Sequence, residues 1–190
     1  LRPGRTPTDL GDITLWFNQT WRLEGSPYRI HGTVTIPPGI RLKIQSGGVV
    51  QFDKDSEMFV QGKLVADGQF GSQKQAYFTS YRDNSGPFLG GQDEGQPGDW
   101  SGINFAEGSK ESLTASVIRY AGGGVFGSPP VVAGVAFEHG SNLQIRGAGS
   151  FYVGNCTFRD SSLQVSGSDH TDISVRDNVF DGCEITVAQF

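Results

Sequence analysis

The last third of the sequence repeats itself, and this repeat limits the folds that the chain can adopt more than any other feature. Three columns of equivalent apolar residues show it: Val132, Val153, Val175; Phe137, Phe158, Phe180; and Leu143, Leu163, Ile185. The members of each column recur at a nearly constant interval in the printed numbering. A regular internal period of this length, about 20 residues or slightly more, is typical of a solenoid, in which each repeat packs against its neighbours.

The segments between turn residues are short and alternate apolar with polar side chains. Runs such as residues 143–145 and 163–165 are too short for helices and suit β-strands. A single repeat cannot bury its apolar face, whereas stacked repeats can. We therefore expect an all-β solenoid with about three short strands per coil, in which parallel strands lie about 4.8 Å apart.

The same period appears near the other end of the chain. Leu42 and Leu64 are separated by the same interval as the later columns, within alternating runs bounded by Pro- and Gly-containing turns. Residues 1–32 lack this pattern, so we expect an N-terminal cap there and a solenoid over residues 33–190. Two segments interrupt the period, at 82–99 and 122–130, and are predicted to be loop insertions.

Composition excludes some classes of function. The net charge is −5 and no run of Lys or Arg occurs, which argues against general nucleic-acid binding. No stretch of apolar residues is long enough for a membrane span. Cys156 and Cys183 fall in different columns of the repeat, so both unpaired thiols and a disulfide between coils are open.

Residues 25–125 carry a resemblance to a family. They contain "GTVTIPPGIRLKIQSGGVVQFDKDSEMFVQGKLVADG", "YFTSYRD", "GDWSGINF" and "VIRYAGGG" in that order. This order resembles the opening of bacterial secreted right-handed parallel β-helix repeat proteins. The resemblance implies a right-handed parallel β-helix and an extracellular or cell-surface location. Relatives of this kind include large adhesin-like proteins and modules beside polysaccharide-cleaving enzymes.

The long loop at 82–99 contains the candidate ligand sites, because loops inserted in a solenoid often carry function. Oxygen donors in it suit calcium, the one cofactor that we consider. The candidate calcium ligands are Asp83, Asn84, Asp93, Glu94 and Asp99. A carbohydrate site at the same loop would use Tyr81, Arg82, Trp100 and Arg119. A solvated acidic loop without ligand is the alternative.

Catalysis is not favoured by the charged columns. The residues after the three phenylalanines are Glu138, Arg159 and Asp181, which alternate in sign along the stack. We expect an exposed ladder of ion pairs, whereas a glycosidase needs two carboxylates facing one bond. Whether the protein is an enzyme is left uncertain, and the balance is against it.

The final strand leads to the functional hypothesis. The chain ends in a strand-like run with Ile185, Val187 and Phe190, and an uncovered solenoid end is a template for association. We expect a non-catalytic structural or adhesive module that assembles end to end into a filament, or docks a neighbouring domain, through these residues. A carbohydrate-binding or polysaccharide-cleaving β-helix is the alternative, and a trimeric phage tail-fibre or spike fragment is a weaker one.

Overall fold

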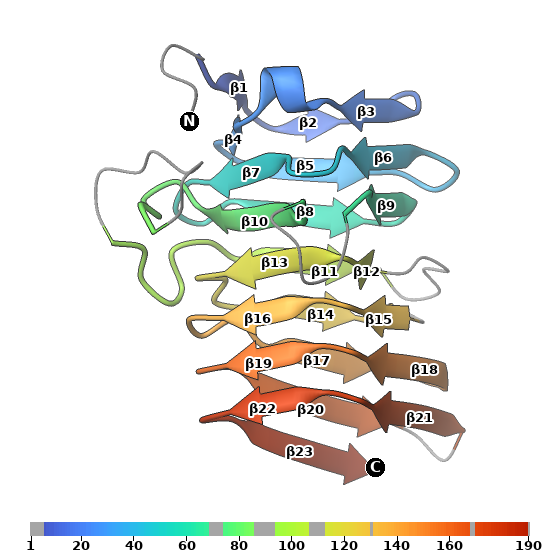
Figure 1. Ribbon diagram of the computed structural model, residues 1–190. Helices are drawn as coiled ribbons and strands as arrows, with labels where there is room; N and C mark the ends of the chain where they lie inside the picture. Colours follow the sequence, from blue (N-terminus) through green and yellow to red (C-terminus); the bar gives the residue numbers. More distant parts are fainter. Residues whose placement is uncertain are drawn as a thin grey trace.

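The chain folds into a parallel β-solenoid. The computed structural model describes residues 6–68, 74–85, 94–106, 113–129, 131–167 and 170–189. Strands make up 57% of it and form a solenoid of about seven turns with a spacing of about 22 residues. Figure 1 shows the coils stacked one on another, with the two termini at opposite ends of the stack. The predicted fold class is confirmed.

Parallel sheets form the faces of the solenoid, as the short alternating runs predict. The first sheet contains, in spatial order, β1 (Thr8–Leu10), β4 (Tyr28–Ile30), β7 (Val49–Phe52), β10 (Ala76–Ser80), β13 (Ser116–Arg119), β16 (Ala136–Glu138), β19 (Thr157–Arg159) and β22 (Val179–Asp181). The second contains β2 (Ile13–Thr14), β5 (Thr33–Ile36), β8 (Glu57–Val60), β11 (Gly102–Phe105), β14 (Val125–Gly127), β17 (Leu143–Arg146), β20 (Ser162–Gly167) and β23 (Glu184–Gln189).

The third face is divided between two smaller sheets. One contains β3 (Gln19–Trp21), β6 (Arg41–Ile44) and β9 (Lys63–Ala66), and the other β12 (Leu113–Thr114), β15 (Val131–Ala133), β18 (Gly149–Gly154) and β21 (Thr171–Arg176). A short 3-10 helix, η1 (Leu23–Gly25), joins β3 to β4. No helix in the described ranges has the length and apolar character needed to cross a membrane.

The register of the repeat is the one that its phenylalanines predict. Phe137 pairs with Phe158, and Phe158 pairs with Phe180. Their rings stack at centroid distances of 4.9 and 4.8 Å inside the solenoid. Stacking therefore occurs at the spacing of neighbouring strands, and the column forms part of a continuous apolar core.

The solenoid begins earlier than the boundary at residue 33. Thr8 pairs with Tyr28, and Ile13 pairs with Val34, so residues 8–21 already supply one strand to each face. The alternating pattern is weak in this coil because β2 holds only two residues. That this coil caps the stack stays a prediction.

The segment 122–130 was predicted to be a loop insertion, but its central part belongs to a coil of the solenoid. Its central residues form β14, which pairs with both β11 and β17. Val125 is fully buried because it continues the inward column between Ile103 and Leu143. Both cysteines are free: Cys156 is buried and Cys183 is partly exposed.

Candidate functional site

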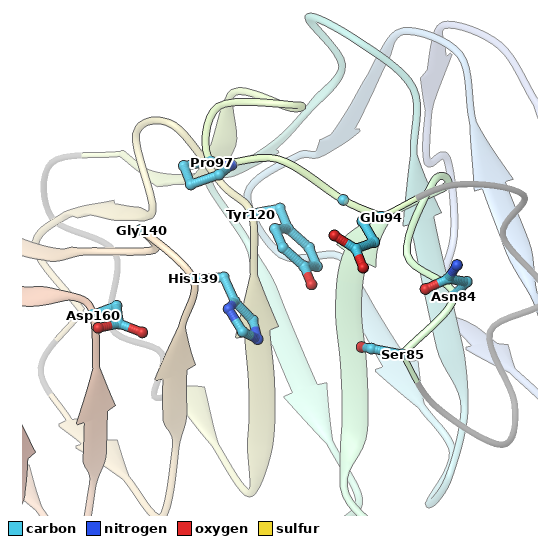
Figure 2. Close-up of a pocket in the computed structure, with 9 residues that line it drawn as sticks. Asn84, Ser85, Glu94, Pro97, Tyr120, His139, Gly140 and Asp160 are labelled. Carbon is cyan, nitrogen blue, oxygen red and sulfur yellow. The ribbon is translucent and has the colours of Figure 1, made fainter.

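A pocket of about 490 Å³ lies between the long loop and the corners of successive coils. Figure 2 shows Asn84, Ser85 and Glu94 on one side, and His139 and Asp160 on the other, with Tyr120 between them. It is lined by Asn84, Ser85, Glu94, Gly95, Pro97, Tyr120, His139, Gly140 and Asp160. The lining thus brings together parts of four successive coils that are far apart in the sequence.

The coil corners place three side chains in one column. Tyr120, His139 and Asp160 each follow the last residue of a strand in the first sheet, and those last residues pair with one another. All three have positive φ angles, of 62°, 55° and 48°. This left-handed conformation turns the chain sharply from one sheet toward the next. Gly182 occupies the equivalent corner of the last coil with a φ of 65°.

The ring of Tyr120 is held between the next coil and the loop. On one side it stacks on the imidazole of His139, at 4.8 Å between centroids and 8° between planes. On the other side lies Gly95, where an added Cβ would come within 2.7 Å of the ring. Burial and the charge of Asp83 raise the pKa of the Tyr120 phenol, although a hydrogen bond with Ser85 opposes this.

Beneath the pocket, charged side chains form a closed network. The carboxylate of Asp83 is fully buried and accepts hydrogen bonds from the Thr79 hydroxyl at 2.6 Å and from Ser85 Oγ at 2.5 Å. Arg119 lies 3.6 Å from the Asp83 carboxylate and donates to Glu138 at 2.8 Å. Burial lowers the pKa of Arg119, but these two carboxylates outweigh it, so the pKa is raised and the guanidinium stays charged.

The predicted ladder of ion pairs is present only in part. Glu138 pairs with Arg119 on one side and with Arg159, at 3.3 Å, on the other. Glu138 is buried rather than exposed, because it lies between two arginines. Asp181 continues the column but forms no ion pair within the described part of the chain.

The residues predicted for carbohydrate binding are not part of the pocket lining. Trp100 is 1% exposed, stacks on Phe52 at 4.0 Å and donates to the Arg119 carbonyl, so its ring offers no free face. Tyr81 is covered by Arg29, whose guanidinium lies 4.1 Å from the ring centroid. Arg82 lies 3.8 Å from Asp99, and Arg119 belongs to the buried network.

The residues predicted to bind calcium do not form one group, because some of them are hydrogen-bonded to other parts of the chain. Asp83 binds its own loop, and Asp99 accepts from the Ser80 hydroxyl at 2.7 Å and from the Gln96 amide at 2.9 Å. Asn84 and Glu94 line the pocket, while Asp93 lies outside the described residues. Across the residues with a described placement, no three His, Cys, Asp or Glu side chains are grouped as metal ligands. Calcium binding stays a prediction.

The corner column of the pocket was not predicted from the sequence. His139 and Asp160 stand at the same offset after a phenylalanine of the repeat, so the repeat itself could have aligned them. Tyr120 was harder to find, because Ile118 stands where the later coils have phenylalanine. No spacing in the sequence indicates that Gly95 contacts Tyr120.

The residues predicted for assembly lie on the last coil. Ile185 and Val187 are 53% and 68% exposed on β23, although they pair with the buried Leu163 and Val165. Phe190 lies outside the described residues. The apolar columns of the core therefore continue into this coil but are not covered there.

Comparison with known proteins adds no relative. The chain matches no protein-family model, and neither a curated protein nor a solved structure shows significant similarity to it. The class that the fold defines is the parallel β-solenoid.

Proposed function

We propose that this chain is a non-catalytic structural module that assembles end to end through its last coil. The observation that carries this proposal is the location of exposed apolar side chains. Seven of the eight large ones in the described ranges lie at the two ends of the solenoid, and the other is Tyr81. The end residues are Trp16, Phe17, Leu23, Val175, Val179, Ile185 and Val187. Exposed apolar clusters commonly mark interaction sites.

The last coil has strand edges to which the strands of another molecule can pair. β21, β22 and β23 are the outermost members of their sheets, so one edge of each is unpaired within the described part of the chain. Such edges accept further strands readily. Covering the exposed apolar side chains would contribute roughly 25 cal/mol for each Å² of apolar surface removed from water.

The first coil is the proposed partner of the last one. β1, β2 and β3 are the outermost strands at the other end of the solenoid. They run in the same direction as their neighbours, so a second copy placed head to tail continues every sheet in parallel. Such a contact does not close on itself and produces a filament.

One polar column makes the contact sensitive to salt. Asp9 pairs with Arg29 in the same outward column in which Asp181 follows Arg159. Head-to-tail stacking therefore places Asp181 beside Asp9 of the next copy, and like charges repel. Because salt screens exposed charges, we expect assembly to increase with ionic strength.

The resemblance suggests the biological setting. We propose that the solenoid is a right-handed β-helix repeat protein of bacterial secreted type, working outside the cell or on its surface as an adhesive or structural element. The support is the order of the quoted motifs together with the coil length of about 22 residues. Nearly all parallel crossover connections are right-handed, which supports the handedness.

The test compares two apolar-to-Lys substitutions with one control on the same strand. We expect Ile185→Lys and Val187→Lys to abolish assembly, because each places a charge in the contact. Thr186→Lys is the control, since Thr186 is exposed and lies on the opposite face of β23. Light scattering and negative-stain microscopy at micromolar concentration measure the assembly state.

The outcomes separate the hypotheses. Filaments from the original chain and from Thr186→Lys, but not from the other two variants, support the proposal. A monomer under all conditions would overturn self-assembly. A closed trimer would contradict the filament and favour the fibre or spike alternative.

A further inference from the structure

Four polar side chains around the pocket have no hydrogen-bonding or ionic partner in the described part of the chain. They are Asn84, Glu94, His139 and Asp160. By contrast, the carboxylates of Asp83, Asp99 and Glu138 nearby are all hydrogen-bonded or ion-paired. The carboxylates of the network are thus already engaged, whereas no residue in the described ranges binds the donors and acceptors of these four side chains.

The charges of the lining define what the ligand can be. Glu94 and Asp160 are carboxylates, and the described residues of the lining include no Lys or Arg. Arg119, which precedes Tyr120 in the sequence, is already held by Glu138 and Asp83, and Arg159, which precedes Asp160, pairs with Glu138. A phosphate, sulfate or uronate would meet two uncompensated negative charges, while ammonium and hydroxyl donors would form charge-assisted hydrogen bonds.

The arrangement of the lining favours a saccharide over a simple amine. Acceptors lie on both walls, because Asn84 and Glu94 belong to the loop and Asp160 belongs to a coil corner (Figure 2). Between them are the edges of the His139 and Tyr120 rings and the apolar Pro97. A sugar ring has hydroxyls that donate in several directions and C–H groups that pack on an apolar side chain such as Pro97. The volume of about 490 Å³ lies within the usual range for small-ligand pockets.

We infer that this pocket binds a saccharide unit without negative charge, and that amino sugars bind there most tightly. In such a complex, ammonium groups pair with Glu94 on one wall or with Asp160 on the other, and hydroxyls reach Asn84 and His139. This site is separate from the last coil and does not depend on assembly.

The test is calorimetric titration with four probes: 1,4-linked tetramers of glucosamine, glucose and galacturonate, and lysine amide. We expect the glucosamine tetramer to bind more tightly than the glucose tetramer, and the galacturonate tetramer not to bind. Raising the salt concentration should weaken binding of the glucosamine tetramer. Absence of binding by both the glucosamine and glucose tetramers would overturn the inference, as would preference for galacturonate. Equal binding of lysine amide and the glucosamine tetramer would overturn the assignment to a saccharide.

Matched variants locate the site. Asp160→Asn removes one charge from the pocket, and we expect it to weaken binding of the glucosamine tetramer by about tenfold. Asp177→Asn is the control, because Asp177 is also exposed at a coil corner with positive φ, of 55°, but does not line the pocket. Gly95→Ala would press a methyl group against the Tyr120 ring, and we expect it to weaken binding as well. Equal effects of Asp160→Asn and Asp177→Asn would contradict this location, and circular dichroism confirms that each variant is folded.

Discussion

The two ends of the solenoid differ in how far their apolar side chains are buried. In the first coil, Leu15 and Trp21 are 1% and 4% exposed, and the Trp21 ring stacks on Tyr28 at 4.7 Å. In the last coil, Ile185 and Val187 are more than half exposed. The first coil buries these inward side chains within the chain itself, whereas the corresponding side chains of the last coil are exposed.

The ionic contacts of charged side chains also differ between the two ends. His31 in the second coil bridges the first and third coils, with Nε2 at 3.0 Å from Asp9 and Nδ1 at 2.5 Å from Asp53. Near the other end, Asp181 has no ionic partner in the described ranges. A solenoid end can therefore be stabilised within one chain, and an end that lacks such contacts is suited to association.

The largest expected effect comes from the stacked phenylalanines. Phe158 is fully buried between two rings, so Phe158→Ala should cost about 3–5 kcal/mol of unfolding free energy. Phe180 stacks on one ring only and is partly exposed, so Phe180→Ala should cost about half as much. Urea unfolding in the non-assembling Ile185→Lys background measures both. Equal losses would show that the last coil is as well packed as the interior.

The two ends are compared directly by one substitution in each. Leu15→Ala should cost about 2–5 kcal/mol because Leu15 is buried in the first coil. Val187→Ala should change the stability of the dilute monomer by less than about 0.5 kcal/mol, since its side chain is already 68% exposed. Thermal unfolding at low protein concentration measures both losses of stability. A larger loss for Val187→Ala than for Leu15→Ala would contradict the comparison.

The contact of His31 predicts a dependence on pH. Hydrogen bonds to Asp9 and then Asp53 raise the pKa of His31 above its value in the unfolded chain. A raised pKa means that the contribution to stability is complete below the unfolded value, about 6.5, and is lost as the pH rises through the folded value. His31→Gln should therefore lower Tm more at pH 5.5 than at pH 8.5. His170→Gln in the exposed turn before β21 is the control, and an equal loss at both pH values would contradict the role of the imidazole.

The smallest effect concerns the two thiols. Cys156 is buried in the coil before the last, and burial raises its pKa to about 11. Cys183 lies in the last coil and is partly exposed. Alkylation of the native monomer followed by mass spectrometry should modify Cys183 and spare Cys156. Equal rates for both would show that the coil containing Cys156 opens as easily as the last one.

Much of the fold could be predicted because residues at equivalent positions of successive coils have the same surroundings. Phe137, Phe158 and Phe180 occupy the same place in successive coils, so the sequence spacing equals the structural register. The prediction was wrong at 122–130, where glycines and prolines hide the inward Val125.

The pocket was not predictable from the sequence. It depends on the contact between Gly95 and Tyr120, which belong to different coils and share no motif. Trp100 was predicted for a carbohydrate site, and its sequence position does not show that its ring lies buried against Phe52. Contacts between a loop and a coil corner follow no repeat, and so no period in the sequence reports them.

Hydrogen exchange at several protein concentrations tests the proposal that another copy covers the last coil. We predict that amide protection in β23 and in β1 to β3 rises together as the concentration increases, while protection in the interior strands stays constant. Protection of β23 that does not depend on concentration would contradict the account.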